Sequence, residues 1–102
     1  MRIIAGNYKG FGLYISKNKN TRPLKDLVRE SIFNLIVHSK KISFEFKKSN
    51  ILDLYAGTGS FGLECLSREA NSVYFVEKDK SSFEILKKNI EKLKLKNKTK
   101  IF

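Results

Sequence analysis

The sequence has little of the chemistry on which many enzymes depend. Its 102 residues include one cysteine, one histidine and one proline, and no tryptophan. A single cysteine and a single histidine are too few for an ordinary zinc site or for a Cys-x-x-Cys redox pair. We therefore expect no metal and no disulfide, with Cys65 as a buried thiol and His38 as a cap at a helix end.

Long apolar runs are also missing. No segment is long and uncharged enough to predict a transmembrane helix, and no secretory apolar region is recognisable. The sequence therefore predicts no membrane partner and a bacterial-type cytoplasmic or organelle-matrix setting, with the cytoplasm as the default. Internal repeats and low-complexity tracts are absent as well.

Acidic residues are scarce relative to basic ones. There are 21 lysines and arginines against 10 aspartates and glutamates, a net charge of +11, and most of the excess lies in the first half. This charge favours an anionic partner such as RNA. An AT-rich coding sequence would also raise the lysine content, so arginine, which grips phosphates bidentately, is the cleaner signal.

The candidate RNA-binding residues all lie within the first 30 positions. They are Arg2, Lys9, Arg22, Lys25 and Arg29. Arg29 has an alternative role, because it could pair with Asp26 or Glu30 on its own helix. Aromatic residues interleave with the lysines here, which suits stacking on RNA bases, although hairpin aromatics also pack on the body of a protein. These aromatics are Tyr8, Phe11 and Tyr14.

The first half of the chain predicts a hairpin and a helix. Residues 2–5 and 12–15 read as strands joined by a turn at 7–10, and residues 18–21 as a loop. A helix should begin at Pro23 and end near His38. Its apolar residues recur at helical spacing and form one stripe: Leu24, Leu27, Val28, Ile32, Leu35 and Ile36. A connector at 39–49 follows, with Phe44 and Phe46 expected to pin it to the core.

The second half predicts a βαβ unit followed by another helix. Residues 50–55 and 72–76 read as strands, with a helix from Ser60 between them. The next helix should open at the capping box Ser81-x-x-Glu84. Its expected buried stripe consists of Phe83, Leu86, Ile90 and Leu93. Residues 94–100 read as a solvated turn, and a third strand begins at about Thr99 and runs to Phe102.

A glycine-rich turn at the end of the first of these strands is the most informative motif. Asp53 comes four positions before Gly57, and Gly57-x-Gly59-x-x-Gly62 satisfies the dinucleotide fingerprint. A carboxylate at this place would repel a pyrophosphate but would attract the ammonium and sulfonium of S-adenosylmethionine (SAM). Glu77 ends the next strand and could accept both ribose hydroxyls. We therefore favour SAM, with a dinucleotide second.

The two strands of the βαβ unit are apolar on both faces, as in the middle of a parallel sheet covered by helices. A sheet of these strands and a short third one would leave an exposed apolar edge, which invites aggregation. We therefore expect the chain to be the N-terminal part of a longer protein, or to be completed by a partner chain.

Taken together, these residues resemble the RsmD-type methyltransferases, which use SAM to methylate the exocyclic amine of a guanine in small-subunit (16S) ribosomal RNA. The resemblance covers the whole chain. It is carried by Arg2-Ile3-Ile4-Ala5-Gly6 with Lys9-Gly10, by Thr21-Arg22-Pro23, by the stretch from Asp53 to Ser60 and by Phe75-Val76-Glu77. It implies an α/β fold, a Rossmann-like class I methyltransferase sheet that is incomplete here. Residues 1–20 would form the hairpin extension, and 21–102 the N-terminal half of the methyltransferase domain.

The resemblance also implies a set of site residues. The SAM-binding residues would be Asp53, Tyr55, Ala56, Gly57, Thr58, Gly59, Glu77 and Lys78. The partner would be ribosomal RNA or a small-subunit assembly particle, in rRNA processing. The family's catalytic motif, Asp or Asn followed by Pro-Pro and an aromatic residue, is missing, since Pro23 is the only proline. We therefore expect this motif to lie beyond Phe102, with no catalytic residue in this chain and no activity from it alone.

The sequence departs from the family pattern at two places. Leu24 and Lys25 replace two small hydroxyl residues, and Lys78 replaces an apolar side chain that would cover adenine. Two other functions stay open. One is a nucleotide-linked oxidoreductase fragment that binds NAD, and the other is a non-enzymatic RNA-binding module or remnant.

Overall fold

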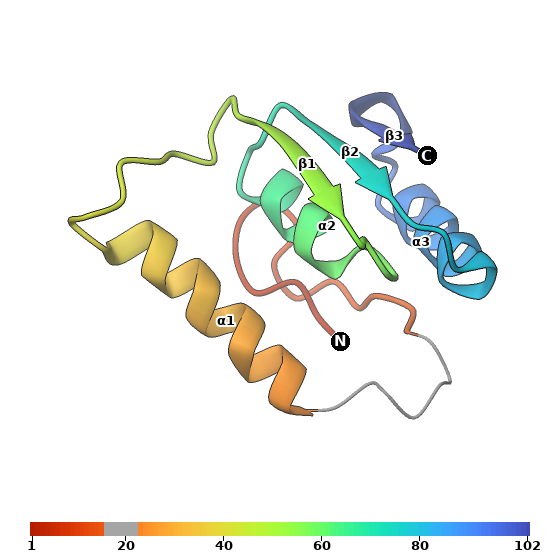
Figure 1. Ribbon diagram of the computed structural model, residues 1–102, viewed down its shortest axis with the longest axis horizontal. Coiled ribbons are helices and arrows are strands. Elements are labelled where there is room, and N and C mark those ends of the chain that lie inside the picture. Colours follow the sequence, from red (N-terminus) through yellow and green to blue (C-terminus); the bar gives the residue numbers. More distant parts are fainter. Residues whose placement is uncertain (16–22) are drawn as a thin grey trace.

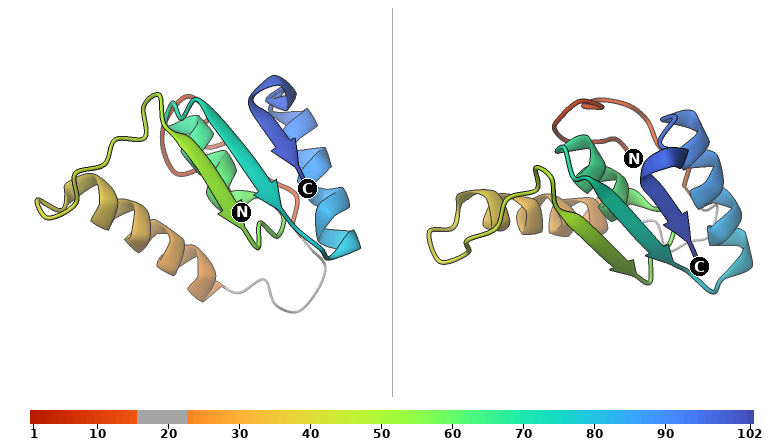
Figure 2. Two further views of the ribbon diagram at one scale, coloured as in Figure 1. Left: turned by 45° about the horizontal axis from the view of Figure 1, so that its top comes forward. Right: turned by 90° about the horizontal axis from the view of Figure 1, so that it is seen from above.

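The computed structural model describes residues 1–15 and 23–102, and side chains within the first helix from residue 27 onward. Over these residues the chain forms a parallel sheet with helices against one of its faces (Figures 1 and 2). The elements are α1 (Pro23–His38), β1 (Asn50–Leu54), α2 (Ser60–Ser67), β2 (Ser72–Val76), α3 (Lys80–Lys92), the 3-10 turn η1 (Lys96–Lys98) and β3 (Thr99–Ile101). The predicted α/β class and incomplete Rossmann-like sheet are confirmed. The loop expected at 18–21 lies outside the described residues.

The sheet has the order β1-β2-β3, and both pairings are parallel. Asp53 lies opposite Phe75, and Leu54 lies opposite Val76. Because both strands run in the same direction, the loop after β1 and the residue after β2 come to the same edge of the sheet. This register brings the glycine turn and Glu77 together.

The core lies between the sheet and α2. Leu63, Val73 and Phe75 are fully buried, and Leu86 joins them from α3. Gly62 permits the close contact of α2 with β2, because a Cβ at this position would collide with the ring of Phe75. The third glycine of the motif therefore serves helix packing.

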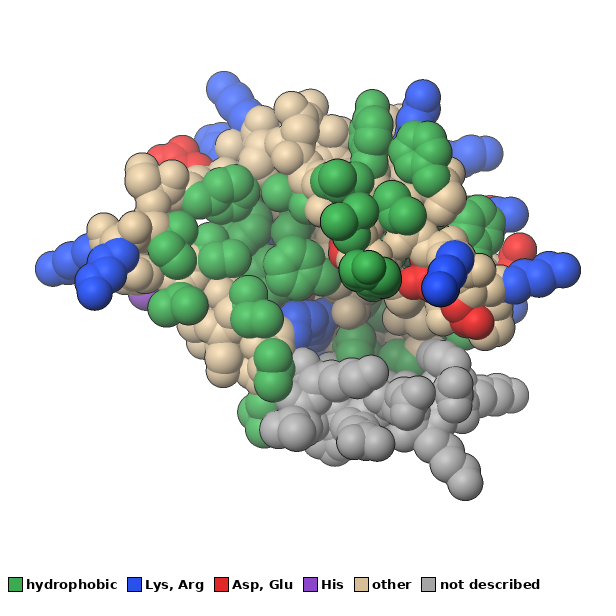
Figure 3. Space-filling model, viewed as in Figure 1, with side chains coloured by type: hydrophobic (Ala, Val, Ile, Leu, Met, Phe, Trp, Pro, Cys, Tyr) green, Lys and Arg blue, Asp and Glu red, His purple; other side chains and the backbone are tan. Residues whose placement is uncertain are grey.

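The opposite face of the sheet is uncovered. Leu52, Leu54 and Tyr74 are 61%, 56% and 45% exposed. Figure 3 shows apolar side chains gathered on the side of the molecule where the strands face the viewer in Figure 1. We call the surface formed by Leu52, Leu54 and Tyr74 the open face of the sheet. Its exposure agrees with the expectation that this sheet is incomplete.

Helix α1 has the predicted bounds, but of the described side chains of its predicted apolar stripe only Ile36 packs against the core. Leu27 and Leu35 are 61% and 59% exposed, whereas Arg29 and Phe33 are buried. Phe33 packs against Phe46 and Phe61 at ring distances of 5.3 and 4.7 Å. Two inward residues four positions apart therefore hold this helix to the body, while most of the described part of the predicted stripe lies outward.

The connector after α1 is pinned by one of its two phenylalanines. Phe46 is buried, whereas Phe44 is 42% exposed and meets Phe46 edge to face. The expectation for Phe46 is confirmed, and the one for Phe44 is not.

The N-terminal hairpin is present without regular strands. Arg2 and Gly12 form an isolated antiparallel bridge, and the Ile3 amide donates to the Phe11 carbonyl at 3.0 Å. The predicted ladder does not extend beyond this bridge, and other amides of the two segments bond to side chains of the body. The Ile4 and Ala5 amides donate to Glu64, and the Tyr14 amide donates to Asn89.

Helix α3 begins one residue before the predicted capping box. Asp79 is its N-cap, and the carboxylate accepts from the Ser82 amide at 3.0 Å. Ser81 instead donates its hydroxyl to Asp79 at 2.8 Å. An acid placed ahead of the helix thus replaces the cap that we assigned to Ser81. The expected stripe is buried at Leu86, Ile90 and Leu93, whereas Phe83 is half-buried.

The third strand, β3, forms at Thr99–Ile101, so it ends one residue before the predicted limit at Phe102. Phe102 nevertheless continues the contact with β2. Its amide donates to the Phe75 carbonyl at 2.8 Å, and its carbonyl accepts from the Glu77 amide at 3.2 Å. The backbone of Phe102 thus fixes the position of Glu77 at the carboxyl edge of the sheet.

The described helices include none that is both long and apolar enough to cross a membrane.

Leu95 is buried, so the segment expected to be a solvated turn also contributes one core side chain.

Candidate cofactor-binding site

The turn between β1 and α2 is a loop with repeated left-handed backbone angles. Tyr55, Gly57 and Gly59 have φ values of 60°, 59° and 93°. The Gly59 amide donates to the Ala56 carbonyl at 3.0 Å, and the Ala56 amide donates to the Val76 carbonyl at 2.9 Å. Gly59 also lies against α3, where a Cβ would collide with the Leu86 side chain. The loop is thus fixed to β2 and α3 at the carboxyl edge of the sheet.

Glu77 lies beside this loop. Its Oε1 accepts from the Gly57 amide at 2.7 Å, and its Oε2 accepts from the Asp79 amide at 2.8 Å. The residue is half-buried, and each oxygen accepts one of the two hydrogen bonds that a carboxylate oxygen can accept, so both keep acceptor capacity for a ligand. The structure therefore brings the second predicted acid against the glycine turn, although no ligand tests its role.

Asp53 lies beneath the start of α2. Its Oδ2 accepts from the Gly62 amide at 3.2 Å. Burial raises the pKa of Asp53 to about 6, the Gly62 amide opposes this rise, and the charge of Glu77 adds to it. The two ion pairs found among the described residues both involve Glu64, so neither neutralises Asp53. Two carboxylates with no cation between them favour a positively charged ligand.

The remaining predicted cofactor residues frame the same loop. Ala56 and Gly59 are buried, and Gly57 and Thr58 are half-buried. Tyr55 is 87% exposed, and Lys78 is exposed as well. Both long side chains can therefore move toward a bound ligand, as their predicted role requires.

The absence of a catalytic residue, with the catalytic motif placed beyond Phe102, stays a prediction. The Phe102 side chain is 63% exposed, and its ring centre lies 5.9 Å from that of Tyr74. It therefore lies beside the open face of the sheet rather than in the glycine loop. We assign Phe102 no part in catalysis or cofactor binding.

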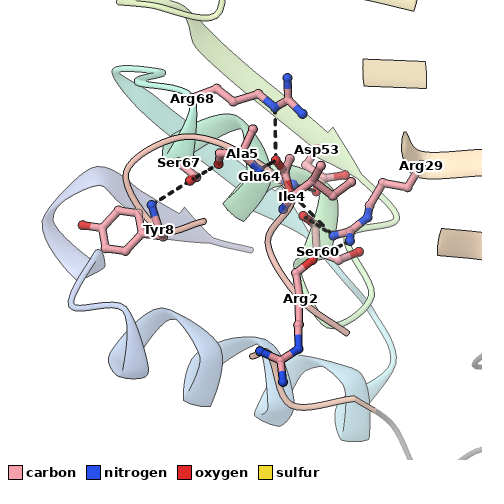
Figure 4. A network of polar contacts seen from close by, with 11 residues as sticks. Arg2, Ile4, Ala5, Tyr8, Arg29, Asp53, Ser60, Glu64, Ser67 and Arg68 are labelled. Carbon is pink, nitrogen blue, oxygen red and sulfur yellow. Dashed lines mark hydrogen bonds and ion pairs between the residues drawn. The ribbon is translucent and has the colours of Figure 1, made fainter. Parts of the chain in front are cut away.

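Glu64 was not singled out in the sequence, yet it organises the structure beneath the site (Figure 4). It is fully buried, and its oxygens accept from the Ile4 and Ala5 amides at 2.8 and 3.0 Å. Arg68 donates to it at 3.1 Å, and the nearest Arg29 nitrogen lies 3.9 Å away. An acid next to Cys65, the residue expected to be buried on this helix, was the available sign of such a role.

Asn89 was also missed. It is fully buried on α3, where its Nδ2 donates to the Thr58 carbonyl at 2.8 Å and to the Tyr14 carbonyl at 3.0 Å. Its Oδ1 accepts from the Tyr14 amide at 2.7 Å. A polar residue between Leu86 and Ile90 on the buried stripe was the signal that could have found it.

The predicted RNA-binding residues fall into three groups. Arg2 and Lys9 are exposed on the hairpin, and the Arg2 guanidinium also donates to the Gly10 carbonyl at 3.0 Å. Arg22, like the Lys25 side chain, lies outside the described residues. Arg29 is only 7% exposed.

The placement of Arg29 corrects its predicted RNA-binding role and its predicted pairing with Glu30. Its Nη2 donates to the Arg2 carbonyl at 2.7 Å, and its Nη1 faces Glu64. Its Nε has no hydrogen-bond partner among the described residues. A guanidinium buried in this way cannot grip a phosphate. Its acidic neighbour is Glu64 rather than Glu30, and the Asp26 side chain lies outside the described ones.

Of the three aromatic residues of the hairpin, one is packed on the body and two are exposed. Tyr8 packs on the core and meets Phe11 edge to face at 5.7 Å. Phe11 and Tyr14 are 46% and 51% exposed. These two remain open to base stacking.

The sequence also raised the questions of a reactive cysteine and of a metal site. Cys65 is a buried free thiol whose pKa is raised to about 12, chiefly by burial, so it is not a nucleophile. Among the side chains of residues 1–15 and 27–102, no cluster of histidine, cysteine, aspartate and glutamate has the geometry of a metal site.

Comparison with known proteins gives a consistent result. The chain is 40% identical over 94 residues to ribosomal RNA small subunit methyltransferase D of Haemophilus influenzae, covering 92% of this chain and 46% of that protein. It is 36% identical over 102 residues to the putative rRNA methyltransferase YlbH of Bacillus subtilis, covering 100% of this chain and 52% of that one. The chain thus spans about half the length of the curated relatives it matches.

Solved structures agree with these relatives. The putative methyltransferase yhhF from Escherichia coli superposes with a TM-score of 0.79 at 31% identity, over 99% of this chain and 50% of that one. The model of the family described as conserved hypothetical protein 95 matches residues 1–102. This chain therefore belongs to that family, with the RsmD-type rRNA methyltransferases among its relatives, and corresponds to an N-terminal part of them.

Proposed function

We propose that this chain is the SAM-binding half of an rRNA methyltransferase that modifies the exocyclic amine of a guanine in small-subunit ribosomal RNA. The observation that carries this proposal is the meeting of the glycine loop, Asp53 and Glu77 at one edge of the sheet, in a chain of a methyltransferase family. The proposed setting is the cytoplasm. We retain residues 1–20 as an RNA-contacting extension and 21–102 as the cofactor-binding half.

Each group at this edge has a proposed part in binding. The carboxylates of Asp53 and Glu77 provide negative charge for the cationic methionine end and acceptors for the ribose hydroxyls. The loop from Ala56 to Gly59 provides backbone contacts, and Tyr55 and Lys78 cover the ligand. Bound SAM supplies an activated methyl group. This chain's residues hold that group in a fixed orientation for an acceptor.

One contact favours SAM over a dinucleotide. In dinucleotide-binding folds the pyrophosphate sits on free amides at the start of the helix that follows the glycine turn. Here the Gly62 amide, in the first turn of α2, already donates to Asp53. A pyrophosphate at this place would also lie against a carboxylate, which disfavours it.

The acceptor side of the reaction is proposed for the whole protein. The relatives are about twice as long as this chain, and the open face of the sheet offers room for further structure. We propose that a segment beyond Phe102 carries the Asp/Asn-Pro-Pro-aromatic motif, which would accept hydrogen bonds from the guanine amine and stack on a base drawn out of the RNA. The proposed phosphate contacts, from which Arg29 is withdrawn, are Arg2, Lys9, Arg22 and Lys25.

Isothermal titration of the 102-residue chain with SAM, and in parallel with NAD, tests the cofactor. We expect binding of SAM, its loss in Asp53→Ala, and no heat with NAD. Binding of NAD in place of SAM would favour the oxidoreductase alternative. RNA binding without either ligand, unchanged in Asp53→Ala, would favour the non-enzymatic RNA-binding module.

A further inference from the structure

Asn89 joins three parts of the molecule that are distant in sequence. It lies on α3, 75 positions after Tyr14 and 31 positions after Thr58, and its amide bonds to the backbone of both. The donors and the acceptor of the side chain are all used, at 2.7 to 3.0 Å. Because the side chain is fully buried, water cannot replace these bonds if one partner moves away.

Two of these bonds hold the N-terminal segment in place. Tyr14 receives one from Asn89 and gives one to it, as a neighbouring strand would. Lys92, one helical turn further, donates to the Gly12 carbonyl at 2.6 Å and lies over the Tyr14 ring at 5.0 Å. Residues 12–14 are therefore seated on α3.

The third bond reaches the glycine loop. Asn89 donates to the carbonyl of Thr58, the residue between the two glycines with positive φ. The next residue, Gly59, is in contact with α3 through Leu86. One side chain thus fixes the peptide that sets the direction of the loop.

We propose that Asn89 is a positioning residue that couples the N-terminal segment to the cofactor loop, so that the loop takes its binding geometry only when residues 12–14 are seated. The choice of SAM as the ligand rests on the proposed function. The effect of Asn89 on the geometry of the loop does not depend on which ligand binds. If the loop takes the binding geometry for a smaller fraction of the time, the apparent affinity for SAM falls in proportion to that fraction. Contact of RNA with the exposed hairpin would then change the affinity for SAM through the same side chain.

The matched control is Ser67. It is also fully buried and also clamps the N-terminal segment, since its Oγ accepts from the Tyr8 amide at 2.9 Å and donates to the Ala5 carbonyl at 2.5 Å. It makes no bond to residues 55–59 among the hydrogen bonds of the described residues. Both Asn89→Ala and Ser67→Ala should lower stability, but only the first removes the link to the loop.

The experiment measures SAM affinity by titration calorimetry and amide hydrogen exchange for the wild-type chain and both variants. We expect Asn89→Ala to weaken SAM binding about tenfold and Ser67→Ala to change it less than about twofold. We expect exchange of the Gly59 amide to accelerate in Asn89→Ala alone, with the amides of β2 unchanged. If Asn89→Ala does not fold, Asn89→Asp carries the same expectation, because it keeps the shape and the acceptor for Tyr14.

The outcomes separate this inference from the proposed function. Equal effects of the two substitutions on SAM affinity and on Gly59 exchange, or none from Asn89→Ala, would overturn the coupling. If the wild-type chain does not bind SAM, the proposed function fails, and exchange of the Gly59 amide still decides whether Asn89 positions the loop.

Discussion

The backbone amide of Gly57 lies 2.7 Å from Oε1 of Glu77, which joins the turn after β1 to the residue that ends β2. The second oxygen of this carboxylate accepts from the Asp79 amide at 2.8 Å. The side chain is therefore held from two sides before a ligand arrives. Preorganisation of this kind lowers the entropic cost of binding.

Substitution of Glu77 by Gln tests the importance of this arrangement. A glutamine offers one acceptor oxygen, so it cannot satisfy both amides, and it has no charge. We expect affinity for SAM to fall by between about tenfold and a hundredfold, as for loss of a charge-assisted bond. Titration calorimetry measures this change. Glu91→Gln, an exposed acid on α3, is the control, and an unchanged affinity in Glu77→Gln would remove Glu77 from the site.

The site could be predicted from the sequence only where a motif marks it. The spacing of Asp53, Gly57 and Glu77 was sufficient to expect that they meet, because parallel strands bring their carboxyl ends to one edge. No motif assigned a role to Glu64 or Asn89. Their importance comes from backbone amides and carbonyls of a distant segment, and the sequence does not reveal which segment will leave such groups unpaired.

Asp53→Asn should make the chain more stable and bind SAM less well. The folded-state pKa of about 6 lies above the ordinary value, so the folded state holds the proton more strongly than the unfolded state. The cost of ionisation therefore appears as the pH rises from about 4 to about 6 and is complete at pH 7. An asparagine keeps an acceptor for Gly62 without this cost. After allowance for partial solvent screening, we expect a gain of about 1–2 kcal/mol at pH 7.

Urea unfolding at pH 7 and at pH 4 measures this effect. The gain from Asp53→Asn should be present at pH 7 and should vanish at pH 4, where the wild-type carboxyl is protonated in the folded state. Affinity of the wild-type chain for SAM should rise with pH up to about 6 and then level, because a cation favours the ionised form. A loss of stability at pH 7 in the variant would contradict this explanation.

Glu64→Gln should strongly destabilise the chain. The buried carboxylate faces Arg29 and Arg68 and accepts from two amides, so a neutral amide leaves buried charges without a partner. We expect a loss of about 3–5 kcal/mol in the free energy of unfolding, measured by urea denaturation. Glu69→Gln is the control, since Glu69 is exposed just beyond the same helix. Similar losses in both variants would show that the burial of Glu64 is unimportant.

The elements of the fold were easier to predict than the direction in which they face. Helix α1 has the expected bounds, yet periodicity selected Leu27 and Leu35, which are exposed, over Arg29 and Phe33, which are buried. The face that packs on the body carries a charged residue, Arg29, so apolar periodicity does not select it, and only the tertiary contacts decide which face is buried. The hairpin forms a single bridge instead of regular strands, and Glu64 and Asn89 hold it to the body through the Ile4 and Tyr14 amides.

The start of α3 offers a test that separates the observed cap from the one predicted. Asp79→Ala removes the carboxylate that bonds to Ser82, whereas Glu84→Ala removes only the acid of the capping box. We expect the first to lower the unfolding temperature by a few degrees and the second to leave it nearly unchanged. The bond to Ser82 holds the pKa of Asp79 below its usual range, so its contribution is present at neutral pH and is lost as the pH falls through that lowered value. Thermal scans of both variants at pH 7 measure these shifts. Equal shifts in the unfolding temperature would favour the predicted capping box over Asp79 as the cap of α3.

Leu52→Lys tests whether the open face is bare in the isolated chain. The side chain is 61% exposed and lies beside Tyr74 on a strand whose other edge is unpaired within the described sheet. Such a surface favours association between copies. We expect the lysine to reduce self-association in sedimentation velocity runs at rising concentration and to change the free energy of unfolding by less than about 0.5 kcal/mol.

Val73→Lys is the matched contrast, because Val73 lies on the same sheet but points into the core, with no exposure. A lysine there would bury an unpaired ammonium, so the chain should not fold. If Leu52→Lys were as damaging as Val73→Lys, the face that carries Leu52 would have to be covered by structure within this chain. If it leaves the fold intact and the chain monomeric, the open face is available to the further structure that we propose for the whole enzyme.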